Sequence, residues 1–202
     1  MITRLAETLC THDTPGMQNE NLKNQLLIAM PNLEDPNFFH TVTLICDHGK
    51  SGAMGIVINR PTGIKVGEVF EQMDIDAGDA GSADAPVFVG GPVQEQRGFV
   101  LHTGTKGWDS TLNVANDVNV TTSRDILEAI ARGDGPSKSL IALGYAGWGA
   151  GQLEQEMLDN AWLTVPADKA ILFDLPPTQR WEAAAKLLGV DLKLLSGESG
   201  HA

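Results

Sequence analysis

The chain has 202 residues, of which 42% are hydrophobic and 5% aromatic. This length suits one well-buried core and is short for two, so we expect one domain with a mainly aliphatic core. The chain carries 26 acidic and 14 basic residues, for a formal net charge of −12. Because nucleic-acid binding depends on neutralising phosphates, and no window is rich in Lys and Arg, this charge argues against direct nucleic-acid binding.

The cysteines and the N-terminal segment indicate the compartment. Two cysteines, Cys10 and Cys46, are too few for a disulfide framework, which is typical of a reducing environment. The N-terminus lacks a long apolar stretch after a basic start, and no run approaches the roughly 18 apolar residues of a membrane span. We therefore expect a soluble, cytoplasmic protein that is not associated with a membrane.

Apolar and β-branched runs predict short strands separated by turns. Strands are expected at residues 25–30, 41–48, 53–59, 86–89, 98–102, 111–121, 161–165 and 169–173. Helices are expected at residues 66–73 and 176–189, and from a cap within residues 122–125 through Ala131, on helical periodicity or on cap, Pro and Gly end signals. The second and third strands have the spacing of a β-hairpin.

This order of elements mixes hairpins with late helices, which favours an α+β fold over a regularly alternating α/β fold. We expect a single compact domain over residues 22–190, with a mostly antiparallel or mixed sheet and flanking helices. A barrel-like sheet is compatible with the same pattern. Residues 1–21 are predicted to form a flexible arm, and residues 191–202 a polar tail.

The most distinctive stretch is residues 139–156. It predicts a short apolar strand, a turn over Gly144–Gly151 with four glycines and two aromatics, and a helix beginning near Ala150. Glu154 lies in the middle of the apolar side of this helix. A carboxylate there needs hydrogen bonds or a charged partner, so Glu154 is either a structural carboxylate that ties down the turn or a site carboxylate.

Four sequence blocks resemble the YqgE/AlgH family of bacterial proteins. They are residues 26–31, residues 52–61, residues 90–93 with 97–102, and residues 143–154. The similarity extends from about Leu22 to Trp162 and implies a compact cytoplasmic α+β domain. The family is largely uncharacterised, and its label of transcriptional regulator comes from one branch. The resemblance therefore implies a fold and no particular reaction.

These blocks end strands with Gly, Pro or Arg, and we expect the strand ends and the glycine turn to meet in one cleft. The candidate residues for binding a ligand or partner are Asn59, Arg60, Gly90, Gly91, Arg97, Tyr145, Trp148 and Glu154. Arginine forks bind carboxylates and phosphates in a planar, bidentate way, and Arg and Trp dominate many peptide contacts. Structural ion pairs with the surplus acids are the alternative for both arginines.

Catalytic candidates are few. Glu154 and His102 could act as bases, but the chain has no nucleophile elbow, no Walker motif and no dinucleotide fingerprint, so no catalytic residue or cofactor is assigned. A satisfied structural histidine is the favoured interpretation of His102. Cys46 and His48 lie two apart on one strand face, the spacing of a chelating pair or an activated thiolate. Zinc needs more ligands, so no metal site is predicted, and a half-buried strand cysteine is favoured.

The leading hypothesis is a non-enzymatic cytoplasmic protein that offers this cleft to a protein segment or small ligand and regulates transcription only indirectly. The alternative is an enzyme of unknown reaction, such as a hydrolase, with Glu154 or His102 as base. Arg60 or Arg97 would then hold an anionic substrate. The sequence leaves the ligand, the partner, the oligomeric state and the redox activity of Cys46 open.

Overall fold

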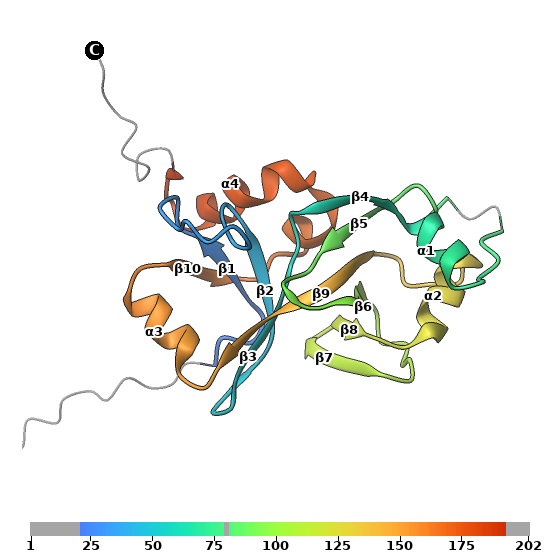
Figure 1. Ribbon diagram of the computed structural model, residues 1–202, viewed down its shortest axis with the longest axis horizontal. Coiled ribbons are helices and arrows are strands. Elements are labelled where there is room, and N and C mark those ends of the chain that lie inside the picture. The colour runs from blue at the N-terminus through green and yellow to red at the C-terminus, as the bar shows by residue number, and fades with distance from the viewer. Residues whose placement is uncertain (1–20, 79–80, 193–202) are drawn as a thin grey trace, which may run out of the picture.

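The computed structural model describes residues 21–78 and 81–192. The predicted arm at 1–21 and tail at 191–202 lie almost wholly outside these ranges, and both stay predictions, as does any role of Cys10. The described chain forms one curled, mostly antiparallel sheet of ten strands, a half-barrel with flanking helices (Figure 1). The α+β prediction is confirmed, and the sheet curls without closing.

The strands are β1 Gln25–Ala29, β2 Val42–Gly49, β3 Gly52–Val57, β4 Pro61–Lys65, β5 Pro86–Val89, β6 Val93–Thr103, β7 Thr111–Ala115, β8 Val118–Thr121, β9 Ser139–Gly149 and β10 Trp162–Pro166. The helices are α1 Val66–Gln72, α2 Arg124–Ala131, α3 Gln152–Leu158 and α4 Pro177–Leu187, with a π-helical turn η1 at Ala170–Asp174. The main strand order is β10-β1-β2-β3-β9-β6-β8-β7. β5 pairs with β9 in parallel, and β4 pairs with β5.

Two predicted strands are wrong for local reasons. The segment 111–121 is a β7–β8 hairpin, because Asn116 adopts a positive φ of 42° and turns the chain. The segment 169–173 is helical, because the Asp168 carboxylate accepts hydrogen bonds from the backbone N–H groups of Ala170 and Ile171. The backbone conformation of Asn116 overrides the apolar pattern in the first segment, and the side chain of Asp168 does so in the second.

The predicted turn over Gly144–Gly151 is also wrong. β9 continues as a strand through Gly149, and only Ala150 and Gly151 form the turn into α3. The first part of β9 pairs with β5 and β6, and residues 146–149 pair with β3. β9 is therefore the strand that joins the two halves of the sheet, crossing the centre of Figure 1.

The glycines of β9 and of the β5–β6 connection allow two backbones to touch. Gly144 has a φ of 73°, and a Cβ there would lie 2.4 Å from the Gly91 carbonyl oxygen. A Cβ on Gly90 would lie 2.2 Å from the Gly144 carbonyl oxygen. Gly90 also donates its N–H to Leu143 O and accepts from Val57 N, which connects β9 to β3. Glycine is required at these positions because the two backbones lie so close together that even a Cβ atom would overlap the neighbouring chain.

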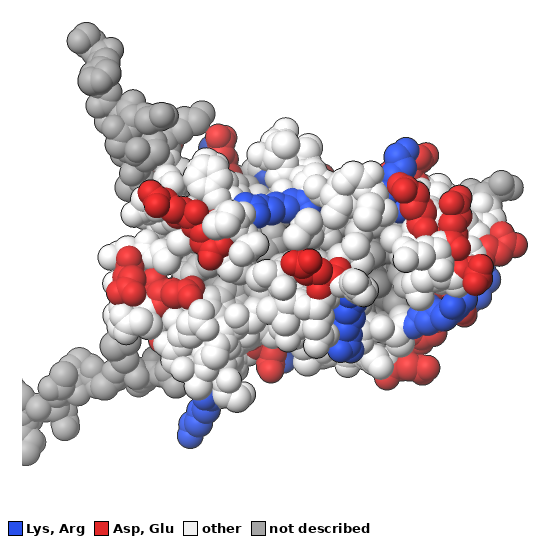
Figure 2. Space-filling view, viewed as in Figure 1, with Lys and Arg blue, Asp and Glu red and all other residues white. Residues whose placement is uncertain are grey.

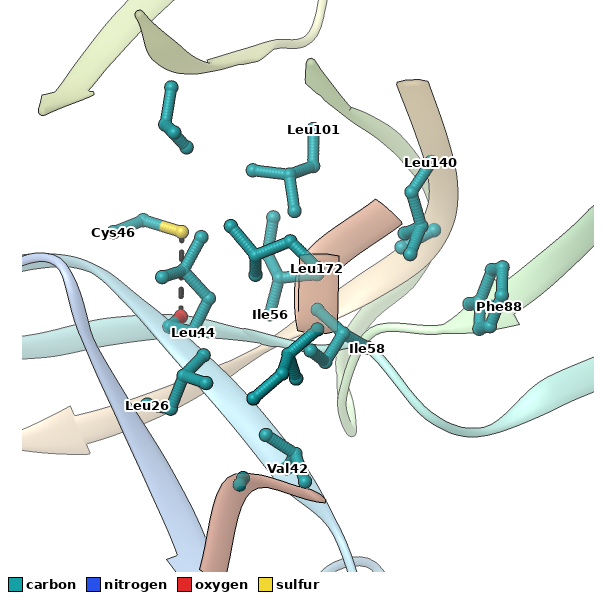
Figure 3. Close-up of a cluster of buried hydrophobic side chains, with 14 of the residues drawn as sticks. Leu26, Val42, Leu44, Cys46, Ile56, Ile58, Phe88, Leu101, Leu140 and Leu172 are labelled. Carbon is teal, nitrogen blue, oxygen red and sulfur yellow. Dashed lines mark hydrogen bonds between the residues drawn. The ribbon is translucent and has the colours of Figure 1, made fainter. Parts of the chain in front are cut away.

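Three apolar clusters lie along the molecule. The largest lies inside the half-barrel, where α4 and η1 cover side chains from β1, β2, β3, β5, β6 and β9 (Figure 3). A second lies beneath α1 and α2, and a third beneath α3, at opposite ends of the long axis (Figure 1). None of the helices within residues 21–78 and 81–192 has the length and apolar character that crossing a bilayer requires.

We predict that Gly144→Ala destabilises the protein by at least about 2 kcal/mol, because the substitution adds a steric overlap with Gly91 and strains a residue at positive φ. Gly147→Ala is the matched control on the same strand. Its Cβ would first meet the Tyr145 ring at 3.3 Å, and we expect a change within about 1 kcal/mol. Urea unfolding of both variants measures the difference, and equal costs would contradict the backbone-contact explanation.

Candidate functional site

Arg97 and Tyr145, two of the predicted site residues, line one cavity of about 480 Å³. Arg97 comes from β6 and Tyr145 from β9, which pair with each other. Phe99 contributes a second aromatic ring, at 5.6 Å from Tyr145 in an edge-to-face arrangement. The remaining wall comes from β3, the start of β6, the segment preceding β7, β7 itself, and β8 with the residue after it: Met54, Gln94, Asp109, Ser110, Thr111, Leu112, Val120 and Thr122. The cavity is therefore an aromatic recess with a cation at its edge.

The Arg97 guanidinium is held loosely. It donates to Gln94 Oε1 and Thr122 Oγ1, both at 3.3 Å, and lies 5.6 Å from the centre of the Phe99 ring. Both bonds are slightly longer than the roughly 2.7–3.2 Å usual for N–H···O hydrogen bonds. Arg97 is exposed and forms no ion pair with any residue in 21–78 or 81–192. A carboxylate entering this cavity could displace either neutral acceptor.

A second cavity, of about 360 Å³, shares Arg97 and Thr122 with the first. Its apolar wall is made by Val69 of α1, Met73 just after α1, Leu127 of α2, and strand residues of β6 and β9. Because Arg97 borders both hollows, its side chain can serve either of them. The described surface around β6 thus places Arg97 beside two apolar recesses, and Arg124, which is paired with Glu128, also lines the second.

Asn59 and Arg60 lie outside these cavities and bind the loop before β2. Asn59 accepts a hydrogen bond from Val42 N and donates to His40 O, both at 2.8 Å. Arg60 donates to the carbonyl oxygens of Pro36, Asn37 and Phe39 at 2.7–2.9 Å. Burial lowers the Arg60 pKa, opposed by the nearby Asp35 charge. Both side chains are occupied in holding the loop.

Trp148 and its surroundings form an aromatic cluster beneath α3. The indole N–H groups of Trp148 and Trp162 both donate to Glu156 Oε2 at 2.9 Å, and Gln152 donates to Glu156 Oε1 at 2.9 Å. Phe38 packs against both indoles, at centroid distances of 5.9 and 5.5 Å. Glu156 is not among the candidate residues chosen from the sequence, so this role was missed. The contact between Glu156 and Trp162, six residues apart, could not be read from a helical or strand period, because the chain reverses between α3 and β10.

Glu154 is paired with a histidine. Its Oε1 lies 3.0 Å from His48 Nε2, with side-chain exposures of 29% for Glu154 and 4% for His48. The backbone N–H of Leu22 donates to His48 Nδ1 at 3.1 Å, so Nδ1 is an acceptor and Nε2 carries the proton donated to Glu154. The Glu154 carboxylate, which was predicted on the apolar side of the helix, thus has a partner in His48 of β2. The pair lies under α3, and neither residue is among the described residues that line the Arg97 cavity.

His102 is fully buried. Its Nε2 lies 2.9 Å from Thr121 Oγ1 and its Nδ1 lies 3.2 Å from Thr103 O. Thr121 Oγ1 is in turn 2.7 Å from Thr111 Oγ1. Burial lowers the His102 pKa, opposed by the bond to the Thr103 carbonyl. Both ring nitrogens are therefore engaged inside the sheet.

Cys46 and His48 do not share a strand face, and that prediction is wrong. The β2–β3 register shifts between Ile45 and Asp47, so Cys46 occupies a bulge. Cys46 consequently packs inside the half-barrel, while His48 turns toward Glu154 under α3. Burial raises the pKa of the Cys46 thiol to about 12. Among residues 21–78 and 81–192, no cluster of three or more His, Cys, Asp or Glu side chains could hold a metal ion.

Figure 2 shows the charge on one face of the molecule. Acidic side chains are spread over it, and Lys and Arg are scattered among them without forming a continuous patch. This arrangement agrees with the net charge of −12.

Comparison with known proteins decides the family. A family model described as AlgH-like matches residues 26–193. The chain belongs to the AlgH-like family. The YqgE/AlgH resemblance predicted from the sequence blocks is thereby confirmed. A UPF0301 protein of Thioalkalivibrio sulfidiphilus is 65% identical over 184 residues, covering 91% of this chain and 98% of the relative.

Solved structures agree with this AlgH-like fold. The solution structure of AlgH from Pseudomonas aeruginosa is 55% identical and superposes with a TM-score of 0.75, covering 92% of this chain and 98% of that one. A crystal structure from Corynebacterium diphtheriae, 22% identical, has a TM-score of 0.68 over 86% of this chain and 90% of that one, and it shows the fold alone.

We predict that Glu156→Ala costs about 2 kcal/mol or more, because the indole N–H groups of Trp148 and Trp162 would lose their acceptor in a part-buried site. Gln155→Ala is the control on the same helix. Gln155 is exposed, and we expect a change of about 0.5 kcal/mol or less. Chemical denaturation measures both costs, and indole proton resonances report on the hydrogen bonds. A loss as small as that of the control would contradict the assigned role.

We predict that Cys46 is inert in the folded protein. In a Cys10→Ser background at pH 8, the neutral thiol inside the core should react with a thiol reagent at least about 100-fold more slowly than in urea. His48→Gln should leave this protection unchanged, because His48 points away from Cys46. Rapid labelling without denaturant, slowed by the His48 substitution, would instead restore the thiolate hypothesis.

Proposed function

We propose that the protein is a non-enzymatic, cytoplasmic binding or regulatory protein that recognises a partner segment at the Arg97 cavity. The observation that carries this proposal is the exposed Arg97 guanidinium, which lacks an ion pair among the described residues and borders a cavity with the Phe99 and Tyr145 rings. Arg and aromatic side chains are the residues that contribute most to binding energy at protein interfaces.

The cavity chemistry favours a peptide segment with a single carboxylate beside an apolar side chain. A carboxylate can take the bidentate position on Arg97, since the present bonds to Gln94 and Thr122 are long. Phe99 and Tyr145 supply the apolar contact. Asp109 lines the same cavity, so a multiply charged phosphate would meet repulsion that one carboxylate, placed near Arg97, largely avoids.

The enzymatic alternative receives less support from the same geometry. Glu154 is paired with His48, and both nitrogens of His102 are hydrogen-bonded within the protein. Neither Glu154 nor His102 lines the Arg97 cavity. A base that must receive a substrate proton needs to lie within hydrogen-bond reach of the substrate.

Any transcriptional role is proposed to be indirect. The net charge of −12 opposes binding to DNA phosphates, and the face in Figure 2 carries scattered rather than clustered bases. A protein partner avoids this electrostatic cost. The proposed regulatory role therefore acts through the Arg97 cavity and a partner protein, and a mobility-shift titration with duplex DNA at low salt should show no salt-sensitive complex.

The peptide proposal is tested with a displayed library of short random peptides selected on the wild-type protein. We expect enrichment of segments with one acidic residue next to an aromatic or aliphatic one. Their affinity, measured by fluorescence polarisation, should fall at least about tenfold in Arg97→Ala and in Tyr145→Ala. Glu154→Gln is the control, because Glu154 is not among the described residues that line the cavity.

Two outcomes would contradict the proposal. Selected peptides that bind Arg97→Ala as tightly as the wild type would place recognition elsewhere. Turnover of an anionic ester or phosphoester by the wild type, lost in Glu154→Gln while substrate binding is kept, would favour the enzymatic alternative.

A further inference from the structure

Arg180 is a buried cation on α4. Only 4% of its surface is exposed. Its Nε donates to Leu175 O at 3.0 Å, its Nη1 donates to Ile58 O, and its guanidinium lies 5.3 Å from the centre of the Phe88 ring. These contacts join α4 to the end of β3 and to β5. Arg180 thus sits where the helix layer meets the open side of the half-barrel.

The charge of Arg180 is not neutralised by the described part of the chain. No Asp or Glu within residues 21–78 and 81–192 forms an ion pair with it. Burial lowers its pKa to about 10, so the guanidinium is still charged at neutral pH. The hydrogen bonds to described residues use two of its five N–H groups. A buried cation with open donors is costly unless an anion completes it.

A cavity of about 290 Å³ lies beside this guanidinium. Phe88, Leu140 and Leu172, from β5, β9 and η1, form part of its apolar wall and are labelled in Figure 3. Ser82 and Ser139 contribute hydroxyls, and no Asp or Glu is among the lining residues within 21–78 and 81–192. This cavity shares no lining residue with the first Arg97 cavity, so it is independent of the function proposed above.

We propose that the Arg180 cavity binds a small organic carboxylate with an apolar body. The carboxylate would accept hydrogen bonds from the open N–H groups of Arg180, and the apolar body would lie against Phe88, Leu140 and Leu172. A hydrated phosphate dianion is disfavoured, because one arginine and mostly apolar walls offer little to replace its water. A neutral molecule of the same shape would leave the cation uncompensated.

The test uses hexanoate as the probe, with 1-hexanol as its neutral counterpart and inorganic phosphate as the other anion. Binding is followed by NMR chemical-shift changes on the full chain. We expect hexanoate to shift resonances of β5, β9 and α4 residues around the cavity, at an affinity at least about tenfold higher than that of either comparison probe. No binding of hexanoate at millimolar concentration, or equal binding of hexanol, would overturn the proposal. Tighter binding of phosphate would overturn the assigned ligand class.

Variants locate the binding. Arg180→Lys keeps the positive charge but removes the planar guanidinium that can bind a carboxylate through two N–H groups. It should weaken hexanoate binding at least about tenfold. Ser139→Phe fills the cavity from an exposed strand position and leaves Arg180 in the sequence. It should abolish binding even if the Arg180 variant does not fold. Arg132→Gln, which removes an exposed arginine at the end of α2, is the control and should bind normally. Unchanged affinity in a folded Ser139→Phe variant would overturn the assignment.

Discussion

The fold depends on direct backbone contact between β9 and the Gly90–Gly91 segment. β9 pairs with β5 and β6 along its first part and with β3 along its second, so it must change direction without losing its partners. Gly144 makes that change at a φ of 73°, with the Gly91 carbonyl where a side chain would start. Since both halves of the sheet hydrogen-bond to this one strand, its path determines how the half-barrel curls and where the cavities open.

Most polar side chains near the sheet are used to hold the chain together. Glu156 accepts hydrogen bonds from two indole N–H groups, and Arg60 donates to three backbone carbonyls. His102 is hydrogen-bonded to a threonine hydroxyl and to a backbone carbonyl. Such groups are expensive to bury unless they are paired, and here the pairing is internal. Arg97 and Arg180 differ, because each keeps a charged fork beside a hollow. That difference directs both binding proposals to arginines.

The family and the charge constrain function in complementary ways. Membership of the AlgH-like family agrees with the observed fold, and the names of the relatives described above state no reaction. The acidic surface makes a protein or small-molecule ligand a better match than a nucleic acid, because an arginine among many acids can still form a short-range, bidentate contact. In both proposals, specific recognition comes from cavity shape and apolar walls, and the arginine sets the orientation of the ligand.

The sequence by itself determined the features that arise from neighbours in the chain. Apolar and β-branched runs predicted β1, β2, β3 and β5, helical periodicity predicted α1 and α2, and the motif blocks predicted the family. Arg97 and Tyr145 were also named in advance, although their shared cavity was not. Only the tertiary structure decided that the glycine block is a strand and that Arg180, four residues before the buried Ala184, faces a cavity. Those outcomes depend on contacts between segments far apart in the chain, which local pattern does not encode.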